Sequence, residues 1–147
     1  MRETIDTPRL RLIPISDAEA EAILRGDLSA VNAGEGWPHE DTLDGLRLAP
    51  GWFVSLDGVV IGDCGTHGPA DEHGDVEIGY GLAEPYRGRG YGGELVLALS
   101  QWLLGRPDVR RVVTRVLVGN VPSRRVLERA GFVLEGDDGE TVSYALG

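Results

Sequence analysis

The stretch from residue 76 to residue 104 is the feature that most constrains how this chain can fold. Residues 76–82 (VEIGYGL) alternate in character, as is typical of a strand with one packed face. Pro85 ends that strand, a glycine-rich turn follows over 87–93 (RGRGYGG), and an apolar helix is predicted over 94–104. The first N–H groups of a helix lack intrahelical partners, and glycines let the backbone approach an anion closely. We therefore predict a pyrophosphate-binding cradle in this stretch.

The length and composition indicate one folded domain over residues 1–147. The chain has 147 residues, of which 41% are hydrophobic, enough for a core of its own. Its single cysteine, Cys64, excludes an internal disulfide and fits a reducing compartment. Residues 1–15 are charged rather than apolar, and the apolar runs are too short to span a bilayer. We therefore expect a soluble cytoplasmic protein.

The charge balance argues against nucleic acid as a partner. The chain has 24 acidic residues against 14 basic ones, all of them arginine, and its net charge is −10. This balance is compatible with a cationic substrate, such as an amine or a peptide N-terminus. The ordinary alternative is that acidic side chains keep the protein soluble.

The sequence pattern predicts strands and helices that form a single mixed α/β domain. Ser16 is the predicted cap of the first helix, Asp41 or Thr42 caps the second, and Asp57-Gly58 is a hairpin turn. The segment 28–48 has little periodicity and suggests a substrate-covering element. Strands are predicted over 7–15, 51–56, 59–66, 76–82, 111–118, 132–134 and 140–146, and helices over 17–25, 38–48, 94–104 and 122–129.

The glycine turn has two other interpretations. Gly88, Gly90 and Gly93 also satisfy the spacing of a dinucleotide-binding fingerprint. That fingerprint belongs after the first strand of a βαβ unit, with an acidic residue at the end of the next strand. Here it starts past the middle of the chain, and no acid ends the strand over 111–118. This disfavours a nucleotide-binding Rossmann fragment, and the second alternative is a purely structural turn.

Two motifs together resemble a known family. Arg87-x-x-Gly90-x-Gly92 is similar to the acyl-CoA signature of the GNAT superfamily of N-acyltransferases. Asn120-x-x-Ser123, followed by 125–132 (RVLERAGF), resembles the second signature of that superfamily. The resemblance is closest to the ribosomal-protein N-terminal acetyltransferase branch, which residues 7–12 (TPRLRL) and 77–80 (EIGY) also resemble. It covers nearly the whole chain.

The resemblance implies both a fold and a reaction. The fold would be a single-domain GNAT-type α/β fold, with a mixed, mostly antiparallel sheet flanked by about four helices. The sheet would splay between the fourth and fifth predicted strands, 76–82 and 111–118. The reaction would be transfer of the acetyl group from acetyl-CoA to a primary amine by direct attack in a ternary complex. The acceptor would be a protein or peptide N-terminus or a small amine.

The resemblance also implies which residues hold acetyl-CoA. The backbone of Tyr80, Gly81 and Leu82 would pair with the pantetheine arm, since strand glycines leave room for a close ligand. Asn120 and Ser123 would line the pantetheine region, and Arg124 or Arg125 would meet the 3′-phosphate. An ordinary turn or cap residue is the alternative for Asn120. The pyrophosphate would be held by Arg87, Gly88, Arg89, Gly90, Tyr91 and Gly92.

Glu77 and Ser123 are the candidate catalytic residues. Glu77 shares a strand face with Gly79 and Gly81, which makes it the candidate base for the amine proton, with an ordinary surface carboxylate as the alternative. By the resemblance, Ser123 would protonate the leaving thiolate, with a helix-start serine as the alternative. Many family members carry a tyrosine acid where this chain has Leu127. The candidates to replace it are Tyr144, Tyr91 and Tyr86.

Glu35 and Trp37, with His39, are the predicted acceptor-pocket residues, with core packing as the alternative for Trp37. His67 and His73 flank an acidic loop without metal-ligand spacing, so no metal site is predicted.

A non-catalytic acyl-CoA-binding or interaction module is the alternative function, because the tyrosine acid is missing. The protein is expected to be a monomer or a homodimer, the latter through the edge of the last strand. No nucleic acid or membrane partner is expected.

Overall fold

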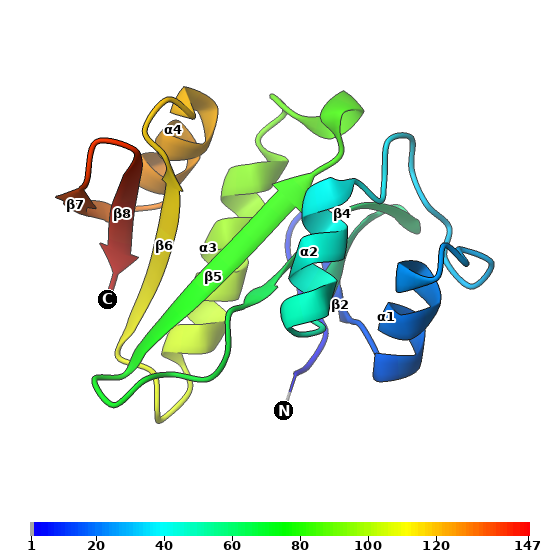
Figure 1. The fold of residues 1–147 in the computed structure, drawn as a ribbon, viewed down its shortest axis with the longest axis horizontal. Helices are drawn as coiled ribbons and strands as arrows, with labels where there is room; N and C mark the ends of the chain where they lie inside the picture. The colour runs from blue at the N-terminus through cyan, green and yellow to red at the C-terminus, as the bar shows by residue number, and fades with distance from the viewer. Residues whose placement is uncertain (1) are drawn as a thin grey trace.

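A computed structural model describes residues 2–147, which form one mixed sheet of eight strands with four α-helices and one short 3₁₀ helix (Figure 1). This confirms the predicted α/β fold class. The elements are β1 (Ile5–Asp6), β2 (Arg11–Pro14), α1 (Asp17–Leu24), α2 (Glu40–Leu48), β3 (Trp52–Leu56), β4 (Val59–Thr66), β5 (Asp75–Leu82), η1 (Glu84–Tyr86), α3 (Tyr91–Leu104), β6 (Arg111–Leu117), α4 (Val121–Arg129), β7 (Val133–Asp137) and β8 (Thr141–Leu146).

The strands follow the order β1-β2-β3-β4-β5-β6-β8-β7 across the sheet. Among the described strands, β5 and β6 are the one parallel pair, and every other pairing is antiparallel. In Figure 1, α2 lies in front of β4 and β5, whereas α3 lies behind β5. The sheet therefore separates two layers of helices, α1 and α2 on one face and α3 and α4 on the other.

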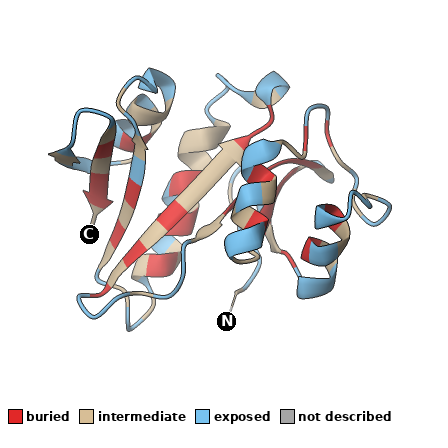
Figure 2. Ribbon diagram, viewed as in Figure 1, coloured by how far each residue is buried: buried red, intermediate tan, exposed pale blue. Residues whose placement is uncertain are grey.

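Each layer buries its own apolar cluster against the sheet. The cluster beneath α3 and α4 includes Ile78, Leu95 and Leu127, all at most 1% exposed. The cluster beneath α1 and α2 includes Ile23, Trp37 and Phe53. Figure 2 shows buried residues spaced along β5 and β6 and on the helix faces turned toward the sheet. This alternation is expected of strands whose two faces have different surroundings.

Local sequence signals explain the first helix well. The Ser16 hydroxyl accepts a hydrogen bond from the N–H of Glu19, whose carboxylate accepts one from the N–H of Ser16. Gly26, just beyond the helix, has a φ of 84°, which suits glycine. The prediction of this helix and its cap is therefore confirmed.

The predicted strand over 7–15 is confirmed over Arg11–Pro14 and wrong before it, because the chain turns at residues 7–10. β1 and β2 form a hairpin, in which the N–H of Thr7 donates to the carbonyl of Leu10 at 2.9 Å. The Thr7 hydroxyl reinforces the turn, since it accepts from the N–H of Leu10 and donates to its carbonyl. Pro8 cannot donate a ladder hydrogen bond, which favours the turn over a continuous strand.

The predicted cap of the second helix is also wrong. α2 starts at Glu40, so its cap is His39 rather than Asp41 or Thr42. The His39 Nδ1 atom accepts a hydrogen bond from the N–H of Thr42 at 3.4 Å, as a serine or aspartate cap would. Histidine is not among the usual capping residues, so sequence pattern alone pointed to the wrong residue.

The last strand does not lie at an edge of the sheet. β8 lies between β6 and β7, so the described edge strands are β1 and β7. The expectation that the last strand offers an edge to a second subunit is therefore wrong. No helix within residues 2–147 is long and apolar enough to cross a membrane.

Candidate functional site

β5 and β6 pair at one end and diverge at the other, which opens a gap in the sheet (Figure 1). Their register pairs Asp75, Val76 and Glu77 with Arg111, Val112 and Val113, and pairing stops there although β5 continues to Leu82. At the point of divergence the buried Thr114 hydroxyl donates to the carbonyl of Ile78 at 3.1 Å. The rest of β5 is therefore paired with β4 but not with β6.

Backbone groups of β5 point into this gap. The carbonyl of Glu77 accepts from the N–H of His67, and the N–H of Ala83 donates to Ile61, so these groups point toward β4. Successive residues of a strand direct their backbone groups to opposite edges, so those of Tyr80 and Leu82 face the gap. By the same alternation the backbone of Gly81 faces β4, unlike its predicted direction.

Arg87 contacts the last residue of β5. Its Nε atom donates to the carbonyl of Leu82 at 2.9 Å, which ties the turn after β5 to the end of that strand. The short helix η1 precedes Arg87 and lets the chain reverse direction toward α3. The guanidinium is consequently held next to the glycine turn.

The glycine turn leads directly into α3. Gly88 and Gly90 have φ angles of 75° and 85°, a region that L side chains rarely adopt, so glycine is required at both positions. Gly90 caps the helix, and the helix starts at Tyr91, three residues earlier than predicted. The N–H groups of its first turn have no intrahelical acceptors, so they are available to an anion.

Glu94 anchors the N-terminal hairpin to the start of α3. Its Oε2 accepts from the Thr7 hydroxyl at 2.5 Å and from the N–H of Arg9 at 2.8 Å, while its Oε1 accepts from Arg9 Nε at 2.8 Å. Burial alone would raise the pKa of Glu94, but the hydrogen bonds from Thr7 and Arg9 outweigh it and hold the pKa below its ordinary value. The carboxylate also lies at the favourable end of the helix dipole.

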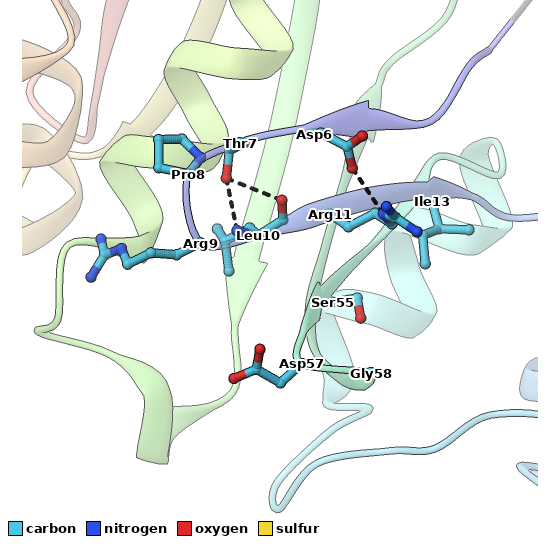
Figure 3. Close-up of a pocket in the computed structure, with 10 residues that line it drawn as sticks. All are labelled: Asp6, Thr7, Pro8, Arg9, Leu10, Arg11, Ile13, Ser55, Asp57 and Gly58. Atoms are coloured by element: carbon cyan, nitrogen blue, oxygen red, sulfur yellow. Dashed lines mark hydrogen bonds and ion pairs between the residues drawn. The ribbon is translucent and has the colours of Figure 1, made fainter.

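Arg9 adds a positive charge to the glycine turn, which the sequence analysis did not predict. Its Nη1 donates to the carbonyl of Arg89 at 3.1 Å, and its guanidinium lies 4.5 Å from the ring centroid of Tyr91. Figure 3 shows Arg9 extending away from the β1–β2 turn. This turn also borders an open hollow of about 470 Å³, on whose rim Arg11 pairs with Asp6 at 2.8 Å.

The start of α4 forms the other wall of the gap. Asn120 caps the helix, because its Oδ1 accepts from the N–H of Ser123 at 3.3 Å. Ser123 Oγ lies 2.7 Å from the hydroxyl oxygen of Tyr80, which comes from β5. Burial raises the pKa of the Tyr80 phenol, against the opposing effect of this hydrogen bond. The phenol therefore stays protonated over the neutral range.

Arg124 and Arg125 are in different situations. Arg124 donates from Nε to the Tyr144 hydroxyl and from Nη1 to the carbonyl of Val118, both at 3.0 Å. These contacts hold α4 against β6 and β8. Arg125 is exposed, and no ion pair of its guanidinium is found within residues 2–147. Of the two, Arg125 is the one free to meet a phosphate.

A cleft of about 400 Å³ lies beneath α2, on the face of β5 that is turned away from α3. Its floor includes Gly65, Gly79 and Gly81, three residues without side chains from the paired strands β4 and β5. Tyr80 of β5 and Arg115 of β6 also line it, so the cleft reaches the two strands that border the gap. Three acidic residues line it, Asp41, Asp44 and Asp63, of which Asp44 pairs with Arg47 at 3.0 Å.

Asp63 is the most enclosed of these carboxylates. Its Oδ2 accepts hydrogen bonds from the Thr42 hydroxyl at 2.5 Å and from Trp37 Nε1 at 3.0 Å. Burial raises the pKa of the Asp63 carboxyl, against the lowering effect of these two hydrogen bonds. Trp37 itself is 4% exposed and packs edge-on against Phe53, with ring centroids 5.8 Å apart.

The predicted acceptor residues thus occupy different places. Trp37 lies behind the Asp63 carboxylate rather than on the cleft surface, and Glu35 is exposed and outside the residues that line the cleft. His39 lies close to Gly81, since a methyl group on that glycine would come within 3.2 Å of the imidazole. The buried His39 Nε2 has no hydrogen-bond partner among the described residues.

Glu77, the predicted base, lies within a group of charged side chains. Its carboxylate is 3.2 Å from Arg115 Nη2 and 3.3 Å from His67 Nδ1. Glu77 is not among the residues that line the cleft, whereas both of its partners are. Glu77 therefore contacts two residues that line the cleft but does not line it itself.

Comparison with known proteins places the chain in a family. The family model described as acetyltransferase (GNAT) domain matches residues 9–133.

The chain belongs to the GNAT acetyltransferase family.

Its relatives agree with this assignment. An uncharacterized N-acetyltransferase of Bacillus subtilis, YjdG, is 29% identical over an alignment of 157 positions. The alignment covers 92% of this chain and 93% of that protein. A solved acetyltransferase structure from Agrobacterium tumefaciens is 27% identical with a TM-score of 0.72, and covers 100% of this chain and 95% of its own. RimL, a ribosomal L7/L12 α-N-protein acetyltransferase solved with coenzyme A, shares the fold at 21% identity and a TM-score of 0.74, over 98% of this chain and 97% of its own.

The edge of β5 that faces β6 has unpaired backbone beyond Glu77. The backbone of Tyr80 and Leu82 has no partner in β6. The turn after β5 offers free N–H groups, and a Cβ at Gly88 or Gly93 would meet no heavy atom within 4 Å, so the backbone there is open to a ligand. Arg87 supplies positive charge in a chain of net charge −10, whereas the charge of Arg9 is paired with Glu94.

Proposed function

We propose that this GNAT protein transfers the acetyl group of acetyl-CoA to a primary amine by direct attack in a ternary complex. The observation that carries the proposal is that β5 has an unpaired backbone edge toward β6 and borders the glycine-floored cleft on one face. An acyl donor in the gap and an amine in the cleft would meet at Tyr80 and Gly81. No covalent enzyme intermediate is then required.

The donor would be held mainly by main-chain groups. The backbone of Tyr80 and Leu82 would pair with the pantetheine amides, and the N–H groups from Gly88 to Gly92 would bind the pyrophosphate, with Arg87 beside them. Asn120 would bind in the pantetheine region and Arg125 would meet the 3′-phosphate. Binding through main-chain groups accounts for the glycines at 88 and 90, whose φ angles are positive.

The acceptor would be a cation in solution. Asp41, Asp44 and Asp63 line the cleft, and the chain has a net charge of −10, so an ammonium group is favoured there over an anion. A small primary amine or a peptide N-terminus fits this description. The likeness of the fold to RimL, which acts on a ribosomal protein N-terminus, supports including N-terminal peptides among the acceptors to be tested.

Ser123 and Tyr80 would complete the reaction on the donor side. When the thioester bond breaks, the departing thiolate needs a proton or a hydrogen-bond donor. Ser123 Oγ and the Tyr80 hydroxyl are hydrogen-bonded to each other at the wall of the gap. Many family members have a tyrosine acid at the position of Leu127, which is fully buried in the core here. The proton would therefore come from Ser123 and Tyr80 instead.

The proposal is tested by two-substrate kinetics with a panel of small amines and N-terminal peptides. Mass spectrometry of the products identifies which acceptor nitrogen carries the acetyl group. We expect at least one acceptor to be acetylated, with intersecting initial-rate lines when both substrates are varied. Parallel lines would contradict direct attack, and acetyl-CoA binding without any acetylated product would favour a non-catalytic acyl-CoA-binding module.

A further inference from the structure

The sheet register places His67 directly beside Glu77. The N–H of His67 donates to the carbonyl of Glu77 at 2.8 Å, one residue beyond the last paired position of β4 and β5, Thr66 with Ile78. Residues that face each other in an antiparallel pair put their side chains on the same face. The His67 Nδ1 atom accordingly lies 3.3 Å from Glu77 Oε2.

The other ring nitrogen of His67 is directed over the floor of the cleft. A methyl group on Gly79 would lie 2.8 Å from His67 Nε2, so the imidazole covers the strand where Gly79 has no side chain. Both His67 and Gly79 line the cleft. One nitrogen thus faces a carboxylate, and the other faces the space proposed for the amine.

Glu77 is less well placed to act on the amine itself. Its Oε1 lies 3.2 Å from Arg115 Nη2, and its Oε2 is shared between Arg115 at 3.4 Å and His67. Both carboxylate oxygens therefore already have partners. A substrate in the cleft would meet the ring of His67 before it reached Glu77.

We propose that His67 is the general base of the reaction and that Glu77 is its positioning residue. Glu77 would hold the neutral imidazole with its proton on Nδ1, which leaves the lone pair of Nε2 directed at the cleft. The inference rests on the proposed acetyl transfer and names the group that accepts the amine proton.

The proton balance of this step is simple. The amine nitrogen bonds to the thioester carbon, the carbon–sulfur bond breaks, and the proton lost by the nitrogen passes to His67 Nε2. The thiolate takes a proton from the Ser123 hydroxyl, which is reprotonated from solvent, and the imidazolium returns its proton to solvent. The contact between His67 and Glu77, at 3.3 Å, is longer than an ordinary hydrogen bond.

Charged groups from several elements lie beside His67 or line the same cleft. Glu77 on β5 is 3.3 Å from the imidazole and also pairs with Arg115 on β6. Asp41 and Asp44 on α2 and Asp63 on β4 line the cleft. The exposed His73 in the same loop is near Glu72 instead, at 3.5 Å, and does not line the cleft. His73 therefore provides a matched control.

The test compares His67→Gln, His67→Ala and His73→Gln. We expect kcat/KM to fall about 10²-fold in the two His67 variants and to remain unchanged in His73→Gln. Added imidazole should restore part of the activity of His67→Ala, because a small base fits the space of the missing ring. The acidic limb of the wild-type pH profile should disappear in His67→Gln. Activity within about threefold of wild type in His67→Gln, or a loss that appears only in KM, would overturn the proposal.

A second measurement does not depend on turnover. Nitrogen-15 NMR of the histidine side chains should show neutral His67 with its proton on Nδ1, and Glu77→Gln should weaken that preference. A proton on Nε2 would overturn the proposal. Wild-type protein that acetylates no amine would contradict the acetyl transfer and the base together, whereas wild-type turnover that survives His67→Gln would contradict the base alone.

Discussion

The Tyr80 hydroxyl oxygen lies 2.7 Å from Ser123 Oγ and connects a strand and a helix across the gap between β5 and β6. Ser123 is the acid that the sequence predicts, whereas nothing in the sequence points to Tyr80 as its partner. The two residues are 43 positions apart, and only the fold brings them together.

We predict that Ser123→Ala lowers kcat roughly 10²-fold and Tyr80→Phe by a smaller factor, because each removes part of the proton supply to the thiolate. The loss should shrink with an aryl thioester as the acetyl donor, since its thiolate departs without a proton. The measurement is kcat of each variant relative to wild type with both donors. Equal losses with both donors would contradict a role in protonation.

We predict that Arg87→Glu weakens acetyl-CoA binding by roughly tenfold or more, because it replaces a cation beside the proposed pyrophosphate site with an anion. Isothermal titration calorimetry gives the Kd. Arg25→Glu is the matched control, since Arg25 is exposed at the end of α1. Because Arg87 also holds the carbonyl of Leu82, thermal unfolding of both variants should accompany the titration. Equal affinity in the two variants would count against the cradle.

We predict that Asp63→Asn raises KM for the amine roughly tenfold while kcat and the Kd of acetyl-CoA remain unchanged. Asparagine keeps an oxygen that can accept from Thr42 and Trp37, but it removes the negative charge that would attract an ammonium group. Asp108→Asn, an exposed position between α3 and β6, serves as the control. A KM that does not change would remove Asp63 from acceptor binding.

We predict that Glu94→Gln destabilises the protein by about 1–2 kcal/mol at pH 7, through weaker hydrogen bonds to Thr7 and Arg9. The folded-state pKa of Glu94 is lowered, so its stabilisation is complete above the ordinary glutamate value of about 4.3 and is lost as the pH falls through the folded value. Urea unfolding at pH 7 and near pH 3 should therefore show that the difference in the free energy of unfolding between wild type and variant is smaller in acid. A difference in the free energy of unfolding that is unchanged or larger near pH 3 would contradict this. Glu21→Gln, at an exposed position, is the control and should unfold with the same free energy as wild type at either pH.

Local signals allowed much of the fold to be predicted. The alternation over 76–82, the glycine turn and the apolar helix are each encoded within a few residues, as is the cap at Ser16. The start of α3 was missed because Gly92 and Gly93 are poor helix formers in general but are tolerated in a first turn. The β1–β2 hairpin was missed because its turn depends on the Thr7 hydroxyl rather than on a glycine.

The site depends more on contacts that sequence does not reveal. Glu77 was found because strand alternation places it with two glycines, but its neighbour His67 emerges only from the β4–β5 register. Arg9 and Glu94 are 85 positions apart, and no local pattern links them. His39 was named as a pocket residue, whereas its role as the cap of α2 follows from three-dimensional geometry.

The most direct test of the account is free-thiol release from acetyl-CoA by the purified protein, with and without an added amine. The account predicts release that requires both the amine and the protein, and that falls in His67→Gln but not in His73→Gln. Thiol release that is absent with every amine, or that proceeds equally without one, would contradict acetyl transfer to an acceptor in the cleft.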